Sequence, residues 1–364
     1  MKKVLFLTNI PSPYRVKFFD ELGKNYDVTV LFHDDSKNHT GRTGSWFENG
    51  SGGFQQIQLT KRVYSRGEDS LCLDVLDWLK KPFDAIIICG YASMTAMLAI
   101  SYLRINRKPF YLEVDGGLVR PDSGLKYWLK KQLVSSASGW ISSGKHTTDY
   151  LMHYGADAER VYEYPFSSLQ EADIRPTVTA SNEKCVLRKM LGMEEEYCLL
   201  SVGQFIHRKG FDVLLKTAAS LEKTVGIYIV GGEPTEEYLK LRDDLGLTNV
   251  HFVGFQKKDA LANYYRAADL FVLPTREDIW GLVINEAMAY GLPVITTDRC
   301  VAGLELVEDG VNGYIVPVED IEALADTIQK VFEADFQKMG EASLEKIRPY
   351  TIENMAKIHA EILK

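Results

Sequence analysis

The chain has 364 residues, too many for one compact core, so its length favours two domains. Hydrophobic residues make up 46% and charged residues 25%, as in an ordinary soluble globular protein. Residues 1–180 carry 22 Lys and Arg against 20 Asp and Glu, whereas the remainder carries 20 against 30. The overall acidity argues against nucleic acid as a partner, and the first half is better suited to an anionic acceptor or a membrane surface.

Cysteine usage and apolar runs indicate a compartment. The five cysteines are scattered and form no Cys-x-x-Cys pattern, which is typical of thiols in a reducing environment. We recognise no secretory signal and no stretch of about 20 apolar residues that would span a bilayer. The sequence therefore predicts a cytoplasmic protein.

Short apolar runs alternate with helical segments through the first half of the chain. Continuous apolar runs of this kind are typical of a parallel sheet covered on both faces, and the alternation predicts a doubly wound α/β domain. The polar, Gly-rich segment 34–53 predicts a mobile loop near the ligand. The expected strands are residues 4–8, 28–32, 54–59, 85–89, 110–114 and 140–142.

Several strand ends in this half carry candidate ligand contacts. The first expected strand is followed by Tyr14 and Arg15 at a helix start, without the Gly-x-Gly-x-x-Gly pattern that NAD binding requires. A solvated helix start is the alternative interpretation of these two residues. Small residues near Tyr91 and at Asp115–Gly116 end two further strands, where a ligand can approach the backbone closely.

Residues 120–134 predict an amphipathic basic helix. Such a helix can lie on anionic lipid, although an ordinary domain helix with a charged face has the same pattern. Its basic and apolar residues are Arg120, Lys126, Lys130, Lys131, Leu125, Tyr127, Trp128, Leu129 and Leu133.

A second strand–helix series follows a Pro-, Ser- and Thr-containing segment at 165–182, which we interpret as the crossing between domains. The first strand of this series runs into a turn with a basic centre, Arg208–Lys209–Gly210, just before a helix. Lys209 supplies positive charge and the helix start supplies N–H donors, a combination suited to a diphosphate. The expected strands are residues 198–202, 226–230, 250–255, 270–273 and 294–296.

The stretch 274–295 aims two carboxylates at the carboxyl edge of the second sheet. Its loop carries Glu277 and Asp278, and a helix that starts near Gly281 carries Glu286 about one turn in. The free N–H groups of Gly281, Leu282 and Val283 point the same way, and such N–H groups favour a phosphate or an electron-rich hydroxyl. The alternative is that these acidic residues only cap the helix.

These motifs together resemble those of the retaining GT-B glycosyltransferases of family 4. In that family two Glu residues flank seven others; here Asp278 takes the place of the first, with Glu277 beside it, and Glu286 matches the second. Lys209 and Gly210 match the family's Gly-Arg…Lys-Gly motif, in which Gln204 replaces the Arg. The resemblance covers residues 198–335 well and is looser over residues 1–165.

The resemblance implies two Rossmann-like domains that face each other across a cleft. We expect an acceptor domain at 1–175, with the closing helix 350–364 packed back onto it, and a donor domain at 183–347. The implied activity is that of a retaining hexosyltransferase. The sugar would pass from a nucleotide-diphosphate sugar (UDP favoured, GDP an option) to a hydroxyl of a glycan or a lipid-diphosphate-linked acceptor, in capsule or other surface polysaccharide synthesis at the cytoplasmic membrane face.

The resemblance also implies residue roles. Lys209 and Arg208 stabilise the leaving diphosphate, Glu286 binds the ribose hydroxyls, and Asp278 holds the sugar with the N–H groups after Gly281. Asp115 stands where many family members carry a His, and His146 is a weaker candidate for that task. The remaining donor-side candidates are Gln204, Gly254, Phe255, Glu277, Gly281, Leu282 and Val283. The acceptor-side candidates are Tyr14, Arg15, Tyr91 and Gly116.

No Asp-x-Asp occurs in the chain, so we predict a reaction without a metal and without a cofactor. Two other functions stay open at this point. One is a GT-B-fold sugar-nucleotide epimerase, which uses carboxylates and His as acid and base. The other is a subunit that binds a sugar nucleotide without turning it over.

Overall fold

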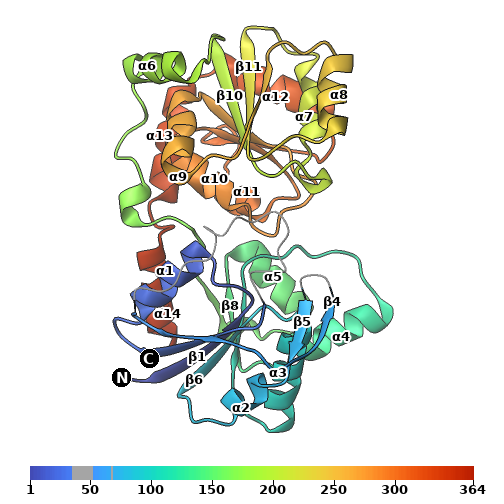
Figure 1. Cartoon of the computed structure of the whole chain (residues 1–364), viewed down its shortest axis with the longest axis vertical. Coiled ribbons are helices and arrows are strands. Elements are labelled where there is room, and N and C mark those ends of the chain that lie inside the picture. Colours follow the sequence, from blue (N-terminus) through green and yellow to red (C-terminus); the bar gives the residue numbers. More distant parts are fainter. Residues whose placement is uncertain (35–51, 67–68) are drawn as a thin grey trace. The chain divides into compact units, whose positions relative to one another are not determined.

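The computed structural model describes residues 1–34, 52–66 and 69–364, and it divides into two compact units (Figure 1). Unit 1 comprises Met1–Ser168 and Tyr350–Lys364, and unit 2 comprises Leu169–Pro349. The chain passes from unit 1 to unit 2 after Ser168, within the segment 165–182 that we interpret as the crossing between domains. Most of the loop predicted at 34–53 lies outside the described residues.

Unit 1 is built on a seven-stranded parallel sheet in the order β3-β2-β1-β6-β7-β8-β9. Val4 of β1, the third strand in this order, is in register with Val28 on one side and Ala85 on the other. The order of strands reverses between β1 and β6, as in a doubly wound fold. The strands are β1 Lys3–Thr8, β2 Asp27–Phe32, β3 Gln55–Gln58, β6 Ala85–Cys89, β7 Tyr111–Val114, β8 Gly139–Ser142 and β9 Val161–Glu163.

Helices cover both faces of this sheet. Figure 1 shows α1 and α14 on one side and α2, α3 and α4 on the other. Pro13 begins α1, where its missing N–H costs nothing, and the Ser93 side chain caps α3 by accepting from Ala96 N at 3.1 Å. The helices are α1 Pro13–Leu22, α2 Val75–Leu79, α3 Met94–Ile105, α4 Gly124–Val134, α5 Lys145–His153 and α14 Ile352–Ile362, with short 3₁₀ turns at Ala158–Arg160 and, in unit 2, Glu171–Asp173.

An antiparallel hairpin of β4 (Arg62–Arg66) and β5 (Asp69–Cys72) was not predicted. Its first strand exposes 56% of Val63 and 52% of Tyr64 and therefore lacks the apolar pattern of a buried strand. The second strand is anchored from the inside, because Cys72 N donates to the Thr95 hydroxyl at 3.0 Å.

Unit 2 contains a six-stranded parallel sheet in the order β12-β11-β10-β13-β14-β15. β10 pairs with β11 on one side and with β13 on the other, so the direction of winding changes between β10 and β13. In open α/β sheets, ligands bind outside the carboxyl ends of the strands at this switch point. The strands are β10 Tyr197–Val202, β11 Val225–Val230, β12 Val250–Val253, β13 Leu270–Leu273, β14 Val294–Thr297 and β15 Gly313–Val316.

The helices of unit 2 also cover both faces, with α9, α10 and α13 on one side and α7, α8 and α12 on the other (Figure 1). A 3₁₀ turn at His207–Lys209, labelled η5, leads directly into α7. The helices are α6 Ser181–Leu191, α7 Phe211–Ala218, α8 Glu236–Asp244, α9 Lys258–Ala267, α10 Leu282–Ala289, α11 Val301–Leu306, α12 Ile321–Glu333 and α13 Phe336–Ile347.

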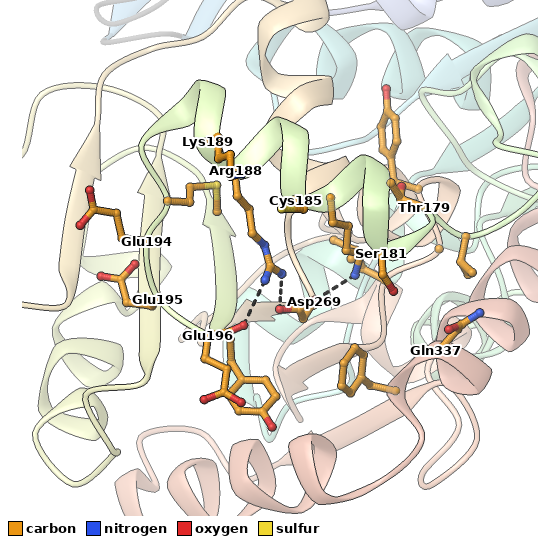
Figure 2. Close-up of a pocket in the computed structure, with 18 of the residues that line it drawn as sticks. Thr179, Ser181, Cys185, Arg188, Lys189, Glu194, Glu195, Glu196, Asp269 and Gln337 are labelled. Carbon is orange, nitrogen blue, oxygen red and sulfur yellow. Dashed lines mark hydrogen bonds and ion pairs between the residues drawn. The ribbon is translucent and has the colours of Figure 1, made fainter.

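Helix α6 is attached to unit 2 through one buried carboxylate (Figure 2). Asp269, which precedes β13, accepts from Lys184 Nζ at 2.9 Å and pairs with Arg188. Its Oδ2 also accepts from the backbone N–H of Cys198 at 2.9 Å. The carboxylate is thus compensated by two cations and one N–H, which permits its burial.

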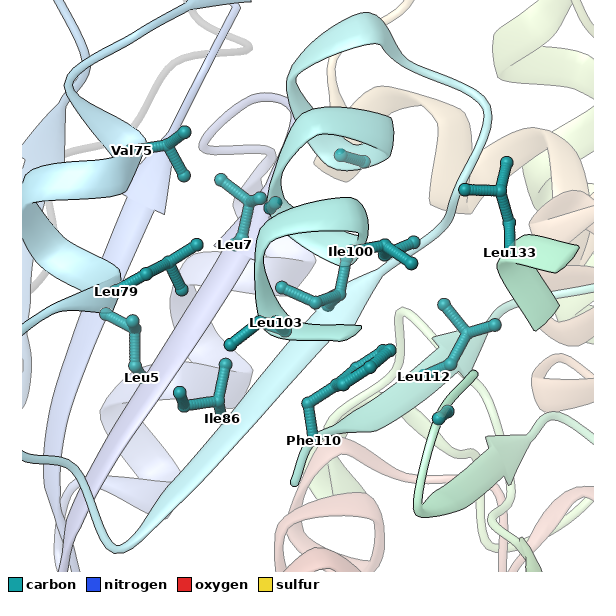
Figure 3. Packing of buried hydrophobic residues seen from close by; sticks show 14 of the residues in the cluster. Leu5, Leu7, Val75, Leu79, Ile86, Ile100, Leu103, Phe110, Leu112 and Leu133 are labelled. Atoms are coloured by element: carbon teal, nitrogen blue, oxygen red, sulfur yellow. The ribbon is translucent and has the colours of Figure 1, made fainter. Parts of the chain in front are cut away.

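The core of unit 1 follows from strands that are apolar on both faces (Figure 3). Leu5 and Leu7 of β1 belong to one cluster with Ile100 and Leu103 of α3. Phe6, which points to the other face, contacts Phe19 of α1 at a ring-centroid distance of 5.0 Å. Burial of each such side chain stabilises the folded state by about 1.5–3 kcal/mol. The sheet is therefore a stable platform for the loops at its edge.

Candidate functional site

Two loops meet at the switch point of unit 2. The turn 203–210 follows β10 and contains η5, and the loop 274–281 follows the adjacent strand β13. Parallel neighbours end at the same edge of a sheet, so both loops start side by side there. The carboxyl edge predicted from the sequence is therefore where the candidate residues Arg208, Lys209 and Asp278 come together.

Gly210 explains how closely these loops approach. Its φ is +69°, and a Cβ at this position would lie 2.0 Å from the carbonyl oxygen of Pro274. No side chain fits at this contact, so the Lys-Gly pair singled out in the sequence is a packing requirement as well as a source of charge. Hydrogen bonds lock the contact, because Arg276 N and the Thr275 hydroxyl donate to Arg208 O at 2.8 and 2.9 Å.

Two cations surround the carboxylate of Asp278. Lys209 Nζ lies 2.5 Å from Oδ2 and Arg208 Nη1 lies 3.2 Å from Oδ1. The side chains of Lys209 and Asp278 are 13% and 12% exposed, whereas that of Arg208 is 46% exposed. The cluster carries one positive charge in excess beside an open edge, so it can bind a second anion or exchange its own carboxylate for one.

The start of α10 faces the same edge. Its N-cap, Gly281, has φ +107°, and a Cβ there would lie 2.7 Å from Cys300 Sγ. A glycine cannot cap the helix with a side chain, so the first-turn N–H groups of Leu282 and Val283 keep the anion-binding character of a helix N-terminus. The loop before it is held in place, since Asp278 N donates to Arg299 O at 2.9 Å.

Glu286 lies one turn into α10 and is partly buried. Its Oε2 accepts from the Tyr265 hydroxyl at 3.0 Å, and the Tyr265 ring stacks on Tyr290 with centroids 5.2 Å apart. Burial raises the pKa of Glu286, and the hydrogen bond from Tyr265 partly offsets this rise. The side chain is thus oriented by a neighbour on α9, a contact that the sequence did not indicate.

Arg276 is a structural residue of the site that sequence reasoning missed. Its guanidinium makes a two-pronged contact with Asp212 of α7, at 2.7 and 2.8 Å, and its Nε lies 2.5 Å from Glu319. Nη1 also donates to His207 O at 2.8 Å. The hydrogen bonds from Arg276 lower the pKa of Asp212. Arg276 therefore ties the 274–281 loop to the 203–210 turn, and only its charge could have hinted at this in the sequence.

The other donor-side candidates lie at the same edge but make no comparable cluster. Gln204 is exposed just after β10, and Gly254 and the 54% exposed Phe255 follow β12 directly. Glu277 contributes its carbonyl oxygen, which accepts from Arg208 Nη1 at 2.9 Å and from the Thr275 hydroxyl at 3.0 Å.

Unit 1 corrects the expectation for Arg15. The sequence placed Arg15 at a ligand, but its side chain is only 4% exposed and is already paired. Nη1 lies 2.5 Å from Glu113 Oε1, and Nη2 lies 2.6 Å from both oxygens of Asp115. The Tyr164 hydroxyl donates to Asp115 at 2.8 Å. Arg15 therefore orders the carboxyl edge of unit 1 from within, and Asp115, with 29% of its side chain exposed, is the member that reaches the surface.

The closing helix α14 completes this cluster. His359 is fully buried, with Nε2 3.3 Å from Glu113 Oε2 and Nδ1 2.8 Å from Met355 O. Burial by itself raises the pKa of Glu113, but the charges and hydrogen bonds of Arg15 and His359 outweigh it and lower that pKa below its usual value. The predicted packing of the closing helix onto unit 1 thus includes a buried polar contact with Glu113.

The remaining candidates of unit 1 are partly buried and have protein partners. Tyr14 packs against Phe166 at a centroid distance of 5.8 Å, and the Tyr91 hydroxyl shares a hydrogen bond with that of Tyr150. Gly116 follows Asp115 at the sheet edge, and His146 lies in the first turn of α5.

Neither a metal-binding cluster nor a membrane-spanning helix is present in the described ranges 1–34, 52–66 and 69–364. No three or more His, Cys, Asp or Glu side chains are grouped there so as to hold a metal ion. None of the helices in these ranges combines the length and the apolar character that a membrane crossing needs.

Comparison with known proteins shows what this part of the chain is similar to. Residues 186–350 match the family described as Glycosyl transferases group 1. D-inositol 3-phosphate glycosyltransferase of Mycolicibacterium smegmatis is 35% identical over 235 residues, which are 62% of this chain and 52% of that protein. The chain thus spans about half the length of such curated relatives.

Solved structures extend the likeness over the whole chain at the level of fold. Sucrose-phosphate synthase from Thermosynechococcus elongatus has a TM-score of 0.77 at 19% identity, covering 99% of this chain and 98% of that one. HepE from Anabaena, in complex with UDP and glucose, has a TM-score of 0.73 at 19% identity and covers 99% of both chains. The expected fold is confirmed: the chain has the GT-B fold, and its residues 186–350 match the group 1 glycosyltransferases.

Proposed function

We propose that this protein is a retaining glycosyltransferase that takes a sugar from a nucleotide-diphosphate sugar bound to unit 2. The observation that carries the proposal is the cluster of Lys209 and Arg208 around Asp278 at the switch point of a sheet that belongs to a group 1 glycosyltransferase domain. A bound diphosphate brings the negative charge that this cluster lacks.

Each donor group has a matching feature at this edge. The diphosphate lies against Lys209 and Arg208, where the charge that develops on the leaving group is stabilised. Asp278 then loses its cation partners and accepts hydrogen bonds from the sugar hydroxyls, beside the N–H groups of Leu282 and Val283. Glu286, oriented by Tyr265, accepts from the ribose.

UDP is the first nucleotide to test, because the similar HepE structure holds UDP and glucose. Isothermal titration with UDP compares the native chain with Lys209→Ala. Loss of a charged hydrogen-bond partner costs about 1.5–3 kcal/mol, so affinity should fall roughly tenfold to 100-fold. Lys240→Ala, an exposed lysine on α8, is the matched control and should bind normally. Undiminished binding by Lys209→Ala contradicts the diphosphate role.

Turnover distinguishes transfer from the two other functions. With a UDP-sugar and a glycan or lipid-linked acceptor, the product should keep the anomeric configuration of the donor. Conversion of the donor into an epimer without acceptor indicates the epimerase instead, and binding without any conversion indicates a non-catalytic subunit. We propose that no metal is needed; loss of turnover in EDTA that Mg²⁺ restores contradicts this part.

The acceptor side is proposed for unit 1, at the exposed part of Asp115. Arg15 and Tyr164 fix the carboxylate there, so it is oriented to accept a hydrogen bond from an incoming hydroxyl. Asp115→Asn keeps the shape and removes the charge. We expect transfer to drop by about 10²–10⁴, as for a positioned catalytic group, with UDP affinity unchanged.

We also propose that α4 rests on an anionic lipid surface, which suits a lipid-linked acceptor. Its outer face exposes 78% of Leu125, 55% of Trp128 and 41% of Leu129, with Lys126 and Lys131 beside them. An exposed apolar stripe flanked by lysines matches an interfacial helix.

Two residues of the amphipathic helix expected at 120–134 do not belong to this stripe. Lys130 is not part of it, because its Nζ lies 3.1 Å from Asp122 and donates to the Tyr154 hydroxyl at 2.9 Å. Leu133 is 6% exposed and anchors the helix in the core of unit 1. The stripe is therefore narrower than the sequence suggested.

Sedimentation with phosphatidylglycerol vesicles tests the lipid contact. The native chain should bind, and the double variant Leu125→Ser with Trp128→Ser should lose most of that binding. Val186→Ser, which removes an equally exposed apolar residue of α6, should keep it. Equal binding by the native chain and the double variant contradicts the proposal.

A further inference from the structure

A cavity of about 900 Å³ lies in unit 2 beneath α6, away from the Lys209 cluster (Figure 2). It is bordered by Tyr197 at the start of β10, by Asp269 before β13 and by Leu292 before β14. These positions mark the amino edge of the sheet, whereas Lys209 and Asp278 follow the carboxyl ends of the strands. Its volume is at the upper end of the range for small-molecule sites.

The charges that line the cavity disfavour a charged ligand. The cavity is lined by three basic side chains, those of Lys184, Arg188 and Lys189, and by five carboxylates that include Asp269 and Glu196. A strong anion would meet the carboxylates and a strong cation would meet the basic groups. A neutral ligand with many hydroxyls meets neither penalty, because each hydroxyl both donates and accepts hydrogen bonds.

Apolar and aromatic groups form part of the same wall. Tyr197, Tyr290 and Phe336 line it, and each is only partly buried, so ring surface remains available. A site that combines ring faces with a few fixed polar groups is suited to a sugar, which has apolar C–H faces between its hydroxyls.

Unused hydrogen-bonding capacity supports a polar ligand. Thr179 lines the cavity, is 6% exposed, and its hydroxyl oxygen has no hydrogen-bond partner. Such a buried, unpaired hydroxyl is unusual in a folded protein. Arg188 also keeps part of its donor fork free, because its contacts with Ala267 O, Glu196 O and Asp269 use three of its five N–H groups.

We propose that this cavity is a second carbohydrate site, which binds an uncharged oligosaccharide. Lys184, Arg188 and Asp269 would bind its hydroxyls from one side, with Thr179 deeper in the wall and the aromatic rings against its apolar faces. The site is separate from the donor cluster, so it stands or falls independently of the proposed reaction.

The chain carries its own reporter for this site. Cys185 lines the cavity and is exposed, whereas Cys72, Cys198 and Cys300 are buried and Cys89 is partly buried. Its reaction with the thiol reagent DTNB can be followed in the native chain, with Cys185→Ser as the blank. Maltotriose and cellotetraose at millimolar concentration should slow this reaction at least threefold, with a saturable dependence on concentration.

Two variants show where the protection comes from. Thr179→Val keeps the shape of the side chain and removes only the unpaired hydroxyl, so the melting temperature should stay equal or rise while the oligosaccharide becomes severalfold weaker. Lys184→Gln should abolish protection, and the distant Lys240→Gln should not change it. Lys209→Ala should weaken UDP binding and keep the protection of Cys185, which separates this site from the donor site.

Three results would overturn the proposal. The first is the absence of protection by any neutral oligosaccharide up to its solubility limit. The second is protection by citrate or glucose 6-phosphate alone, which would make the cavity an anion site. The third is a lower melting temperature of Thr179→Val, which would show that the hydroxyl has a partner within the protein.

Discussion

The two units each hold a cluster of charges at the carboxyl edge of their sheet, and the two clusters are built in opposite ways. In unit 2 two cations, Lys209 and Arg208, share one carboxylate, and Arg208 is 46% exposed. In unit 1 one arginine lies between Glu113 and Asp115, and its side chain is 4% exposed.

The difference shows which cluster can exchange partners. A buried cation that holds two carboxylates cannot leave them without stranding charge in a poorly solvated place, so the unit 1 cluster is a fixed part of the fold. The unit 2 cluster has a spare positive charge near solvent, so an incoming phosphate replaces one ionic partner by another. Ligand exchange is therefore expected in unit 2 and structural support in unit 1.

The largest effect is expected for Arg15→Ala, which tests whether the unit 1 cluster is a fixed part of the fold. It leaves two carboxylates close together without their cation, and removing one partner of a buried pair costs about 3–5 kcal/mol. We expect markedly faster hydrogen–deuterium exchange in β7 and α14 and a lower melting temperature. Exchange in β10 and β13 of unit 2 serves as the internal control.

Arg15→Lys separates the effect of the charge at this position from that of the two-nitrogen contact. Lysine keeps the charge but cannot contact Glu113 and Asp115 through two separate nitrogens, so it should recover only part of the loss. If Arg15→Ala left exchange in β7 unchanged, the cluster could not be the support of this edge.

Acid is the second test, because the pKa of Glu113 is lowered in the fold. At a pH above its ordinary pKa of 4.5, the ionised carboxyl of Glu113 stabilises the native state. This contribution is lost as the pH falls through the lower pKa that Glu113 has in the folded protein. The contribution is on the order of 3 kcal/mol, so unit 1 should lose stability between about pH 4.5 and 2.

Glu113→Gln tests whether Glu113 causes this loss of stability in acid. The variant should be less stable at pH 7 and should lose less further stability on acidification than the native chain does. If the melting temperature of the variant fell between pH 7 and pH 3 as much as that of the native chain, the effect would belong to other carboxylates.

Much of the fold follows from the sequence because its determinants are local. The apolar runs at 85–89 and 270–273 coincide with β6 and β13, since strands buried on both faces need no polar alternation. The β4–β5 hairpin escaped prediction because its exposed residues Val63 and Tyr64 carry no such pattern.

The residues of the candidate site also differ in whether local sequence predicts their positions. Lys209, Asp278 and Glu286 belong to short motifs with fixed spacing, so their positions after strands were predictable. Arg15 and Arg276 were misjudged or missed because their side-chain partners lie 43 to 100 residues away, and charge alone does not select a partner at that distance. Only the packing of the folded chain determines which cation faces solvent and which is buried.

A third prediction concerns the Arg276 contact with Asp212, which joins the two loops of the unit 2 site. Arg276→Ala removes a two-pronged charged contact, and we expect a loss of about 1–3 kcal/mol in local stability of the 274–281 loop. UDP affinity should fall by roughly tenfold although Arg276 does not touch the ligand. Arg299→Ala, another arginine of this edge that is 43% exposed, is the control and should bind UDP normally.

The smallest and most diagnostic effect is expected for Asp278→Asn. The native carboxylate competes with a diphosphate for Lys209, from which it is 2.5 Å away, so removing its charge should strengthen UDP binding by a few-fold, or about 0.5–1 kcal/mol. The same variant should transfer sugar far more slowly, because the carboxylate is no longer there to hold the sugar hydroxyls. Titration with UDP and a turnover assay on one preparation measure both effects. Weaker UDP binding would mean that Asp278 supports the diphosphate site instead of yielding to the ligand, and the contrast between an exchangeable and a fixed cluster would then fail.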